Sequence, residues 1–236
     1  MTDISRISSN RPALLPPLWL AAFSGFSVLY IALPGLIPPA WHWFFKIIPI
    51  ALLLQLTLTS TEGKVRTLLG LGLVLSAIGD VLLALDGLFV QGLAAFLLAQ
   101  ITYTVLFLTQ YRWQTRRLAW AALIVVYALV CTLLIVPEAG DMKVPVTAYM
   151  IAISLMAVAA GFRGDQQFLW VAMGALIFMF SDTLIAISRF VLPFEYSGIA
   201  VMTTYYVAQL LICVGIVRHS KSVDGRSFSM RKPSIS

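Results

Sequence analysis

Long apolar runs recur along the chain and are separated by short polar breaks. Each run holds about 20 residues, the length that crosses the ~30 Å hydrocarbon core of a bilayer as a helix. The apolar residues are continuous rather than alternating, which is typical of helices and not of barrel strands. The pattern predicts eight membrane-spanning helices, near residues 17–36, 41–59, 66–85, 88–110, 117–136, 144–162, 167–188 and 197–217.

The composition agrees with this pattern and defines the fold class. Of 236 residues, 60% are hydrophobic and 11% are charged, whereas a soluble domain carries about a quarter charged residues. We therefore expect an all-α, polytopic membrane bundle whose transmembrane domain covers residues 17–217. Residues 1–16 form a cytoplasmic N-terminal segment in this interpretation, and residues 218–236 form a basic, serine-rich cytoplasmic tail that we expect to be disordered.

The distribution of positive charge predicts the orientation of the helices. With a cytoplasmic N-terminus, thirteen lysines and arginines fall on cytoplasmic segments, and only Lys143 and Arg189 fall on outer loops. This asymmetry favours a multi-pass protein of a plasma membrane, the inner membrane in a bacterium, with both termini in the cytoplasm. The net charge of +6 then reflects topology and contact with anionic membrane lipids rather than binding of nucleic acid.

Two stretches of the chain are similar to each other. "GLVLSAIGDVLLAL" and "GALIFMFSDTLIAI" superpose with a shift of 102 residues, which places Asp80 on Asp182. In the next span of each stretch an Ala-Gln pair follows, with Gln100 in one and Gln209 in the other. Repeats four helices apart keep the same orientation in the membrane. We therefore expect a pseudo-twofold repeat of four plus four helices, with halves at about 17–110 and 117–217.

Three ionisable residues are expected at one depth inside the membrane. Asp80 lies 14 residues past Arg66 and Asp182 lies 15 residues past Gln167, so both are ~21 Å from the cytoplasmic side at ~1.5 Å per residue. Lys46 lies ~7–8 Å below the outer surface by the same measure. Buried charges of this kind face the bundle interior, pair with one another and mark functional sites. The structural alternative is that Lys46 only bridges the two aspartates and holds helices together.

Other polar residues are candidates for substrate binding or for tuning the protonation of the aspartates. They lie within the predicted spans and either line a wet cavity or cross-link helices by hydrogen bonds. Besides Lys46, the set is Ser76, Gln100, Tyr103, Ser181, Tyr205, Tyr206 and Gln209.

Several kinds of chemistry lack the residues that they need. The two histidines, His42 and His219, lie at span ends on opposite faces of the membrane, so neither a zinc site nor a Ser-His-Asp triad can be assembled. We expect no metal and no cofactor. Two carboxylates with a lysine suit acid–base catalysis, but they also suit proton-coupled transport of a lipid or amphiphile. A non-catalytic lipid-binding protein is the third possibility.

The chain resembles the YhhN-like lysoplasmalogenases, a family of eight-span membrane proteins. The resemblance depends on "SAIGDVLLALDGLF" with "AAFLLAQITYTVLF", and on "GALIFMFSDTLIAISRF" with "VMTTYYVAQLLICVG". The lysine and proline of "KIIPI" are similar as well. In order and spacing, the likeness covers nearly all of the chain except the two tails.

The resemblance implies hydrolysis of the vinyl ether bond of lysoplasmalogens. The products would be a fatty aldehyde and glycerophosphocholine or glycerophosphoethanolamine. A vinyl ether is hydrolysed by protonation at carbon, followed by attack of water on the oxocarbenium ion, which requires a general acid and an anionic stabiliser or base. Asp80 and Asp182 are expected to take these two roles, in an order that the sequence leaves open. Lys46 would tune their protonation or bind the phosphate of the lysophospholipid substrate.

Overall fold

The computed structural model describes residues 15–230, and within them the chain is helical with no strand. The helices are α1 (Pro17–Ala32), α2 (His42–Ser60), α3 (Gly63–Leu83), α4 (Phe89–Leu108), α5 (Leu118–Ile135), α6 (Lys143–Gly161), α7 (Phe168–Ala186) and α8 (Ser197–Met230). Short 3-10 turns join some of them, and a π-helical turn, η5 (Ile187–Val191), follows α7. Almost all of the predicted N-terminal segment, residues 1–14, lies outside the described residues.

The described residues contain six helical segments that are long and apolar enough to cross a membrane. One of them, Thr115–Gly161, comprises both α5 and α6, and α1 is a shorter apolar helix. Many large apolar side chains are exposed on the outer helices, such as Leu133 and Leu134 of α5. In water such a surface would aggregate, whereas in a bilayer it contacts lipid. The protein is therefore an integral membrane protein, and the all-α membrane class predicted from the sequence is confirmed.

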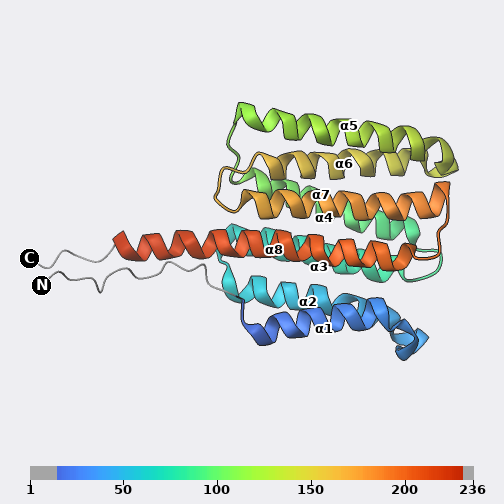
Figure 1. Ribbon diagram of the computed structural model, residues 1–236, viewed down its shortest axis with the longest axis horizontal. Helices are drawn as coiled ribbons and strands as arrows, with labels where there is room; N and C mark the ends of the chain where they lie inside the picture. The colour runs from blue at the N-terminus through green and yellow to red at the C-terminus, as the bar shows by residue number, and fades with distance from the viewer. Residues whose placement is uncertain (1–14, 231–236) are drawn as a thin grey trace, which may run out of the picture.

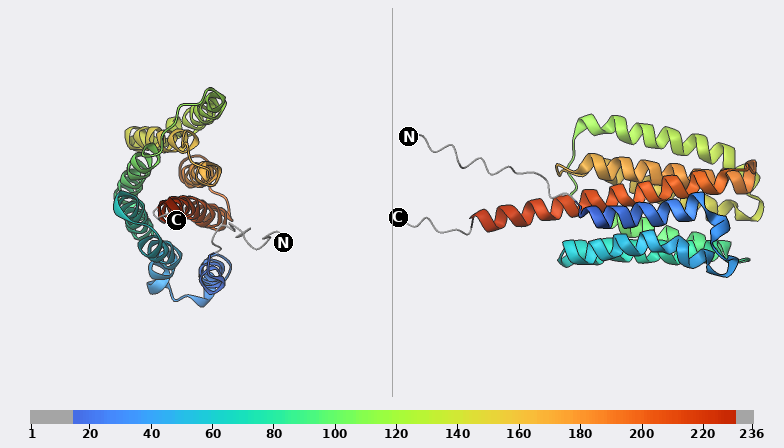
Figure 2. Two further views of the ribbon diagram at one scale, coloured as in Figure 1. Left: turned by 90° about the vertical axis from the view of Figure 1, so that its left-hand side faces the viewer. Right: turned by 60° about the horizontal axis from the view of Figure 1, so that its bottom comes forward.

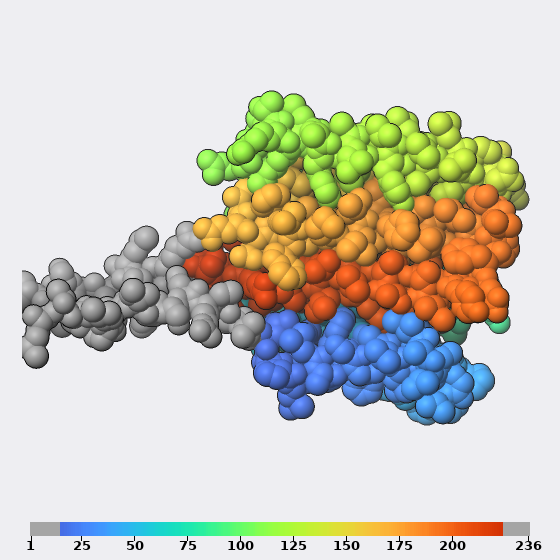
Figure 3. All heavy atoms as spheres, viewed as in Figure 1, coloured from blue at the N-terminus to red at the C-terminus, as the bar shows by residue number. Residues whose placement is uncertain are grey.

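The helices form a curved row that wraps around a central pair. Figure 2 shows α5, α6, α4, α3, α2 and α1 following one another along an arc, with α7 and α8 on its concave side. Consecutive helices run in opposite directions, so both chain ends lie at one end of the bundle (Figure 1). We call this the terminal end and the opposite one the distal end. On the face drawn in Figure 3, α8 lies between α1 and α7, and α5 forms the outer edge.

The central pair packs closely because α7 carries a glycine where α8 crosses it. A Cβ atom at Gly174 would stand 2.9 Å from the carbonyl oxygen of Ala208 and 2.8 Å from Cγ1 of Ile212. Small residues of this kind let membrane helices approach each other's backbone and gain dispersion contacts, since lipid supplies no hydrophobic driving force. The close approach fixes the position of α7 relative to α8.

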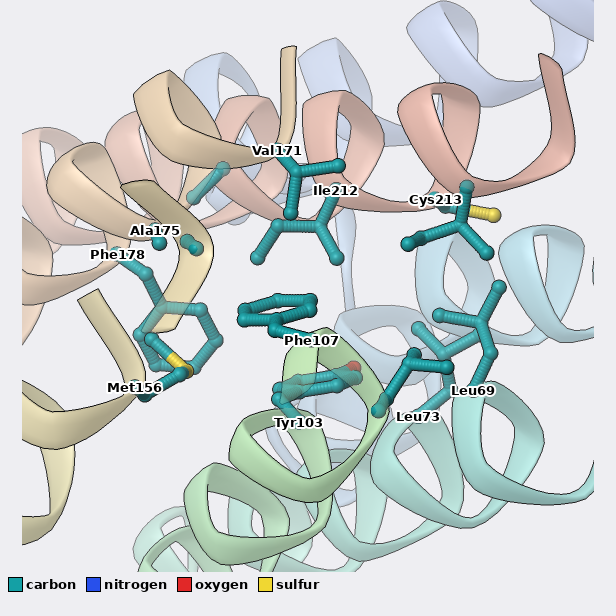
Figure 4. Close-up of a cluster of buried hydrophobic side chains, with 14 of the residues drawn as sticks. Leu69, Leu73, Tyr103, Phe107, Met156, Val171, Ala175, Phe178, Ile212 and Cys213 are labelled. Atoms are coloured by element: carbon teal, nitrogen blue, oxygen red, sulfur yellow. The ribbon is translucent and has the colours of Figure 1, made fainter. Parts of the chain in front are cut away.

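The core lies between the central pair and the arc. Figure 4 shows Phe107 and Tyr103 of α4 beneath Val171 of α7 and Ile212 of α8. The two aromatic rings are stacked, with centroids 6.0 Å apart, and both side chains are fully buried. Close packing of these side chains fixes the rotation of each helix about its axis. It therefore also fixes the directions in which the polar side chains of the helices point.

The loops at the terminal end are tied together. Arg163, in the connection from α6 to α7, is buried and forms an ion pair with Asp165 at 2.6 Å. Burial lowers the pKa of Arg163, and the Asp165 carboxylate counteracts this effect. The same connection pairs with the loop after α4, because the Arg112 amide donates to the Phe162 carbonyl at 2.8 Å. These contacts hold the α4–α5 and α6–α7 connections together at the terminal end.

The last helix continues beyond the predicted span. α8 runs on to Met230, so its backbone is helical through part of the segment 218–236 that the sequence predicts as a polar tail. Residues 231–236 lie outside the described residues.

Candidate acid–base site

A small cavity between α2, α3, α7 and α8 brings together the three ionisable residues that were expected at one depth. It has a volume of ≈ 20 Å³, and Lys46, Asp80, Ser181, Asp182 and Tyr205 are among the residues that line it. We call it the reaction chamber. Because a water molecule needs ~10–15 Å³, the chamber has room for one water next to both carboxyl groups. Asp80 and Asp182 lie in the last turns of two parallel helices, α3 and α7.

Asp80 is held by a cation and a hydroxyl group. Its Oδ1 lies 3.3 Å from Nζ of Lys46, and its Oδ2 accepts a hydrogen bond of 2.7 Å from the hydroxyl of Tyr205. The Lys46 ammonium also donates to the main-chain carbonyl of Asp80 at 3.2 Å. Only 2% of Asp80 is exposed, so the carboxylate exchanges its hydration for these partners. Such an arrangement stabilises the ionised form.

Asp182 has a different environment. Its Oδ2 accepts hydrogen bonds from the Tyr149 hydroxyl and, at 3.1 Å, from Nε2 of Gln100. Within the part of the chain that the structure describes, no cation lies in ion-pair range of Asp182. The Gln100 carbonyl oxygen is buried and has no hydrogen-bond partner. The two carboxyl groups therefore share one cavity but not one electrostatic environment.

Two further candidate residues support the chamber by bonding to the backbone around it. Ser181 donates to the carbonyl of Val201 at 3.0 Å and so joins α7 to α8. Tyr206 donates to the carbonyl of Lys46 at 2.7 Å, three residues before Pro49, which lies inside α2. These bonds fix the segment of α2 from which the lysine side chain extends.

The remaining candidates form a separate polar cluster, one helical turn nearer the terminal end. Gln209 donates to the Ser76 hydroxyl at 3.0 Å and accepts from the Tyr103 hydroxyl at 2.9 Å. Ser76 precedes Asp80 by four residues and Gln209 follows Tyr205 by four, so each lies on the same helix face as a residue of the chamber. All three side chains are fully buried and bonded to one another. This cluster cross-links α3, α4 and α8 beneath the chamber rather than lining it.

Tyr149 was not predicted from the sequence as a residue of the site. It lies in the middle of α6, a helix from which no residue was selected, and its hydroxyl reaches Asp182. Its signal in the sequence was a single tyrosine in a largely apolar span, "VTAYMIAISL". Among the described residues no group of three or more His, Cys, Asp or Glu side chains comes together in a way that could hold a metal ion.

These features define the class of protein: an integral membrane helical bundle with two buried carboxyl groups and a lysine around a water-sized cavity. The model of the YhhN family matches residues 41–216, which cover α2 to α7 and most of α8. The chain belongs to the YhhN family.

Individual relatives are similar over most of their length. A protein of Mycobacterium bovis named lysoplasmalogenase is 33% identical over 179 residues, covering 72% of this chain and 68% of its own. The human protein lysoplasmalogenase TMEM86A is 30% identical over 239 residues, covering 95% of this chain and 96% of its own. Human lysoplasmalogenase TMEM86B is 32% identical over 216 residues, covering 89% and 91%. No solved structure matches the chain.

Proposed function

We propose that this protein is a lysoplasmalogenase, which hydrolyses the vinyl ether bond of 1-alkenyl lysophospholipids to a fatty aldehyde and a glycerophosphodiester. Its membership of the YhhN family and the names of its relatives support this activity. The observation that carries the mechanism is the asymmetry of the two carboxyl groups: Asp80 has a cation at 3.3 Å, whereas Asp182 has none in ion-pair range among the described residues. Different environments give two carboxyl groups different roles.

Asp182 is the general acid. Away from a cation, a buried carboxyl group favours its neutral form and can deliver a proton. It protonates the vinyl carbon that does not carry oxygen, and the electron pair of the double bond forms the new C–H bond. The remaining carbon becomes an oxocarbenium ion, stabilised by the ether oxygen. This oxocarbenium ion lies opposite the ionised Asp80 in the chamber.

Asp80 is the general base. It removes a proton from the water in the chamber as the water oxygen bonds to the oxocarbenium carbon, giving a hemiacetal. The proton on Asp80 then passes to the ether oxygen as the C–O bond breaks, while Asp182 takes the hydroxyl proton of the hemiacetal. Aldehyde and alcohol are released, and both carboxyl groups return to their starting protonation states.

Gln100 is suited to both protonation states of Asp182. With its amide nitrogen toward Asp182 it donates to the carboxylate, as the contact of 3.1 Å describes. A rotation of the amide by half a turn would direct the unpartnered oxygen toward the protonated carboxyl group, which could then donate to it. Gln100 therefore keeps a hydrogen bond to Asp182 before and after the proton is transferred.

Aldehyde release tests this function. The purified protein in detergent is given 1-alkenyl-glycerophosphoethanolamine, and the wild type is compared with Asp80→Asn, Asp182→Asn and, as a matched control, Asp86→Asn in the exposed turn after α3. Loss of either aspartate should lower the rate by about 10²–10⁴, and the control should retain it. In D₂O, each aldehyde should carry one deuterium on the carbon next to the carbonyl, because Asp182 delivers that proton from solvent.

The outcomes separate the alternatives. An Asp182→Asn protein that is folded and fully active would remove the general acid from the mechanism. Aldehyde without deuterium at that carbon would rule out protonation at carbon. If folded wild type releases no aldehyde, proton-coupled flux of the lipid in liposomes would support the transporter instead.

The arrangement in the membrane is part of the same proposal. Eight spans, including α1 and separate crossings by α5 and α6, lie in a plasma membrane with both termini in the cytoplasm. The excess of lysine and arginine at the terminal end supports this orientation. The equivalent positions of Asp80 and Asp182 on α3 and α7 support a repeat of four plus four helices. In this orientation the distal end of the bundle, which carries the chamber, lies near the outer leaflet.

A further inference from the structure

Two further cavities adjoin the reaction chamber on different sides. The vestibule lies at the distal end, has a volume of ≈ 580 Å³, and is lined by Tyr30, Lys46, Ser188, Arg189 and Ser197 among others. The apolar groove lies between α4, α6 and α7, has a volume of ≈ 30 Å³, and is lined by Leu93, Phe96, Val146, Met150 and Phe190 among others. The groove reaches Asp182, and the vestibule reaches Lys46.

Two apolar side chains are common to all three spaces. Leu83 and Ile185 line the vestibule, the groove and the chamber alike. Each follows a carboxyl group by three residues, Leu83 after Asp80 and Ile185 after Asp182, so each lies on the same helix face as that carboxyl group. Because both side chains also line the chamber, a molecule that extends from the vestibule into the groove past them lies close to the chamber and its two aspartates.

We propose that the vestibule and the groove are the phosphate and hydrocarbon subsites for one single-chain phospholipid, joined at a constriction formed by Leu83 and Ile185. The inference rests on the proposed function and adds to it the features that select the substrate. The polar head lies in the vestibule, the hydrocarbon chain lies in the groove, and the bond between them lies at the chamber.

Arg189 is the phosphate-binding residue of the vestibule. It is exposed, and within the described residues no carboxylate forms an ion pair with it; its guanidinium lies 3.8 Å from the ring centroid of Phe89. The lining of the vestibule contains two cations and no acidic residue, whereas Lys46 is already paired with Asp80. A guanidinium with free donors matches a phosphate in charge and geometry. Arg189 is carried by η5, and π-helical turns are frequent at functional sites.

The groove is suited to the hydrocarbon chain of the lipid. Apart from Tyr149 and Asp182, its lining side chains are apolar, which suits an alkenyl chain and excludes a headgroup. At ≈ 30 Å³ the groove is smaller than a hydrocarbon chain, so the proposal requires Met150 and Phe190 to move aside when the chain binds.

Binding of an analogue that cannot be hydrolysed tests the phosphate subsite. The probes are 1-O-hexadecyl-glycerophosphoethanolamine and 1-O-hexadecylglycerol, which lacks the phosphate, and the readout is the dissociation constant for the purified protein. Arg189→Gln should weaken binding of the phospholipid by about 10-fold or more and leave that of the alkylglycerol unchanged. Lys143→Gln, which removes another exposed cation of the distal end, should change neither. Equal weakening of both probes, or of neither, would overturn the assignment.

A pair of tryptophan substitutions on α6 tests the groove. Met150 is buried in the groove, whereas the next residue, Ile151, is 57% exposed on the outer surface of the helix. Met150→Trp should shift the preference among alkyl probes toward shorter chains, and Ile151→Trp should not. An unchanged chain-length profile in a folded Met150→Trp protein would refute the hydrocarbon subsite. These experiments measure binding alone, so failure of the protein to release aldehyde would disprove the hydrolase without affecting their outcome.

Discussion

Replacing Lys46 with methionine tests whether the ion pair supports catalysis, stability or both. Nζ of Lys46 lies 3.3 Å from the Asp80 carboxylate, and both side chains are largely buried, 11% and 3% exposed. Coulomb's law at this distance gives ~5 kcal/mol for an effective dielectric constant of about 20. Removal of one partner from a buried pair costs ~3–5 kcal/mol. We therefore expect Lys46→Met to lower the free energy of unfolding by ~3–5 kcal/mol, because it leaves an uncompensated carboxylate in the bundle.

The double variant Lys46→Met/Asp80→Asn separates the two effects. The neutral side chain that Asp80→Asn introduces keeps an oxygen that can accept the hydrogen bond from Tyr205, and it does not need a cation nearby. The double variant should therefore regain most of the lost stability but remain inactive. Thermal unfolding in detergent measures the first quantity and aldehyde release the second, with Lys143→Met as the control. The reasoning would be refuted by a double variant no more stable than Lys46→Met, or by full activity in Lys46→Met.

Two other substitutions test the surroundings of the chamber. Gly72→Ala should destabilise the protein by ~1–3 kcal/mol, because a Cβ there would clash with the ring of Tyr103. Gly25→Ala should be neutral in a thermal-unfolding assay, because among the described residues no neighbouring atom lies within 4 Å of the added Cβ. Tyr149→Phe removes a hydrogen bond to Asp182. It should lower the rate of aldehyde release about 10-fold and the free energy of unfolding by only ~1 kcal/mol. An unchanged rate would mean that Tyr149 does not help to position Asp182.

The depth of each polar residue in the membrane was predictable from the sequence, but the direction in which its side chain points was not. Counting residues along each helix places Asp80, Asp182 and Lys46 at one depth in the membrane, because the rise per residue of an α-helix is nearly constant. The rotation of each helix depends on packing with partners distant in the chain. For that reason Gln100 and Gln209, which the internal similarity makes equivalent, have different partners: Gln100 donates to Asp182, whereas Gln209 donates to Ser76 one turn away.

The order of the helices was not predictable either. Apolar periodicity identifies helices, but an evenly apolar helix such as α5 does not reveal which face meets protein. α6 is a neighbour of α4 rather than of α3, and this arrangement brings the Tyr149 hydroxyl to Asp182. A lone tyrosine in an apolar span has many possible positions, and only the packed bundle selects one.

The directions of the helices around the site give the backbone itself an electrical polarity. α3 and α7 present their C-terminal ends near the chamber, and α8 begins with Ser197 and Gly198 at the wall of the vestibule. A helix carries about half a positive charge at its N-terminus and half a negative charge at its C-terminus. In the proposed reaction, the N-terminus of α8 would favour the anionic phosphate in the vestibule, and the C-terminus of α3 would favour the positive charge of the oxocarbenium ion at the chamber. Fixed dipoles of this kind do not have to reorient during a reaction, so under the proposed mechanism the directions of the helices would themselves stabilise the charges that bind and form at the site.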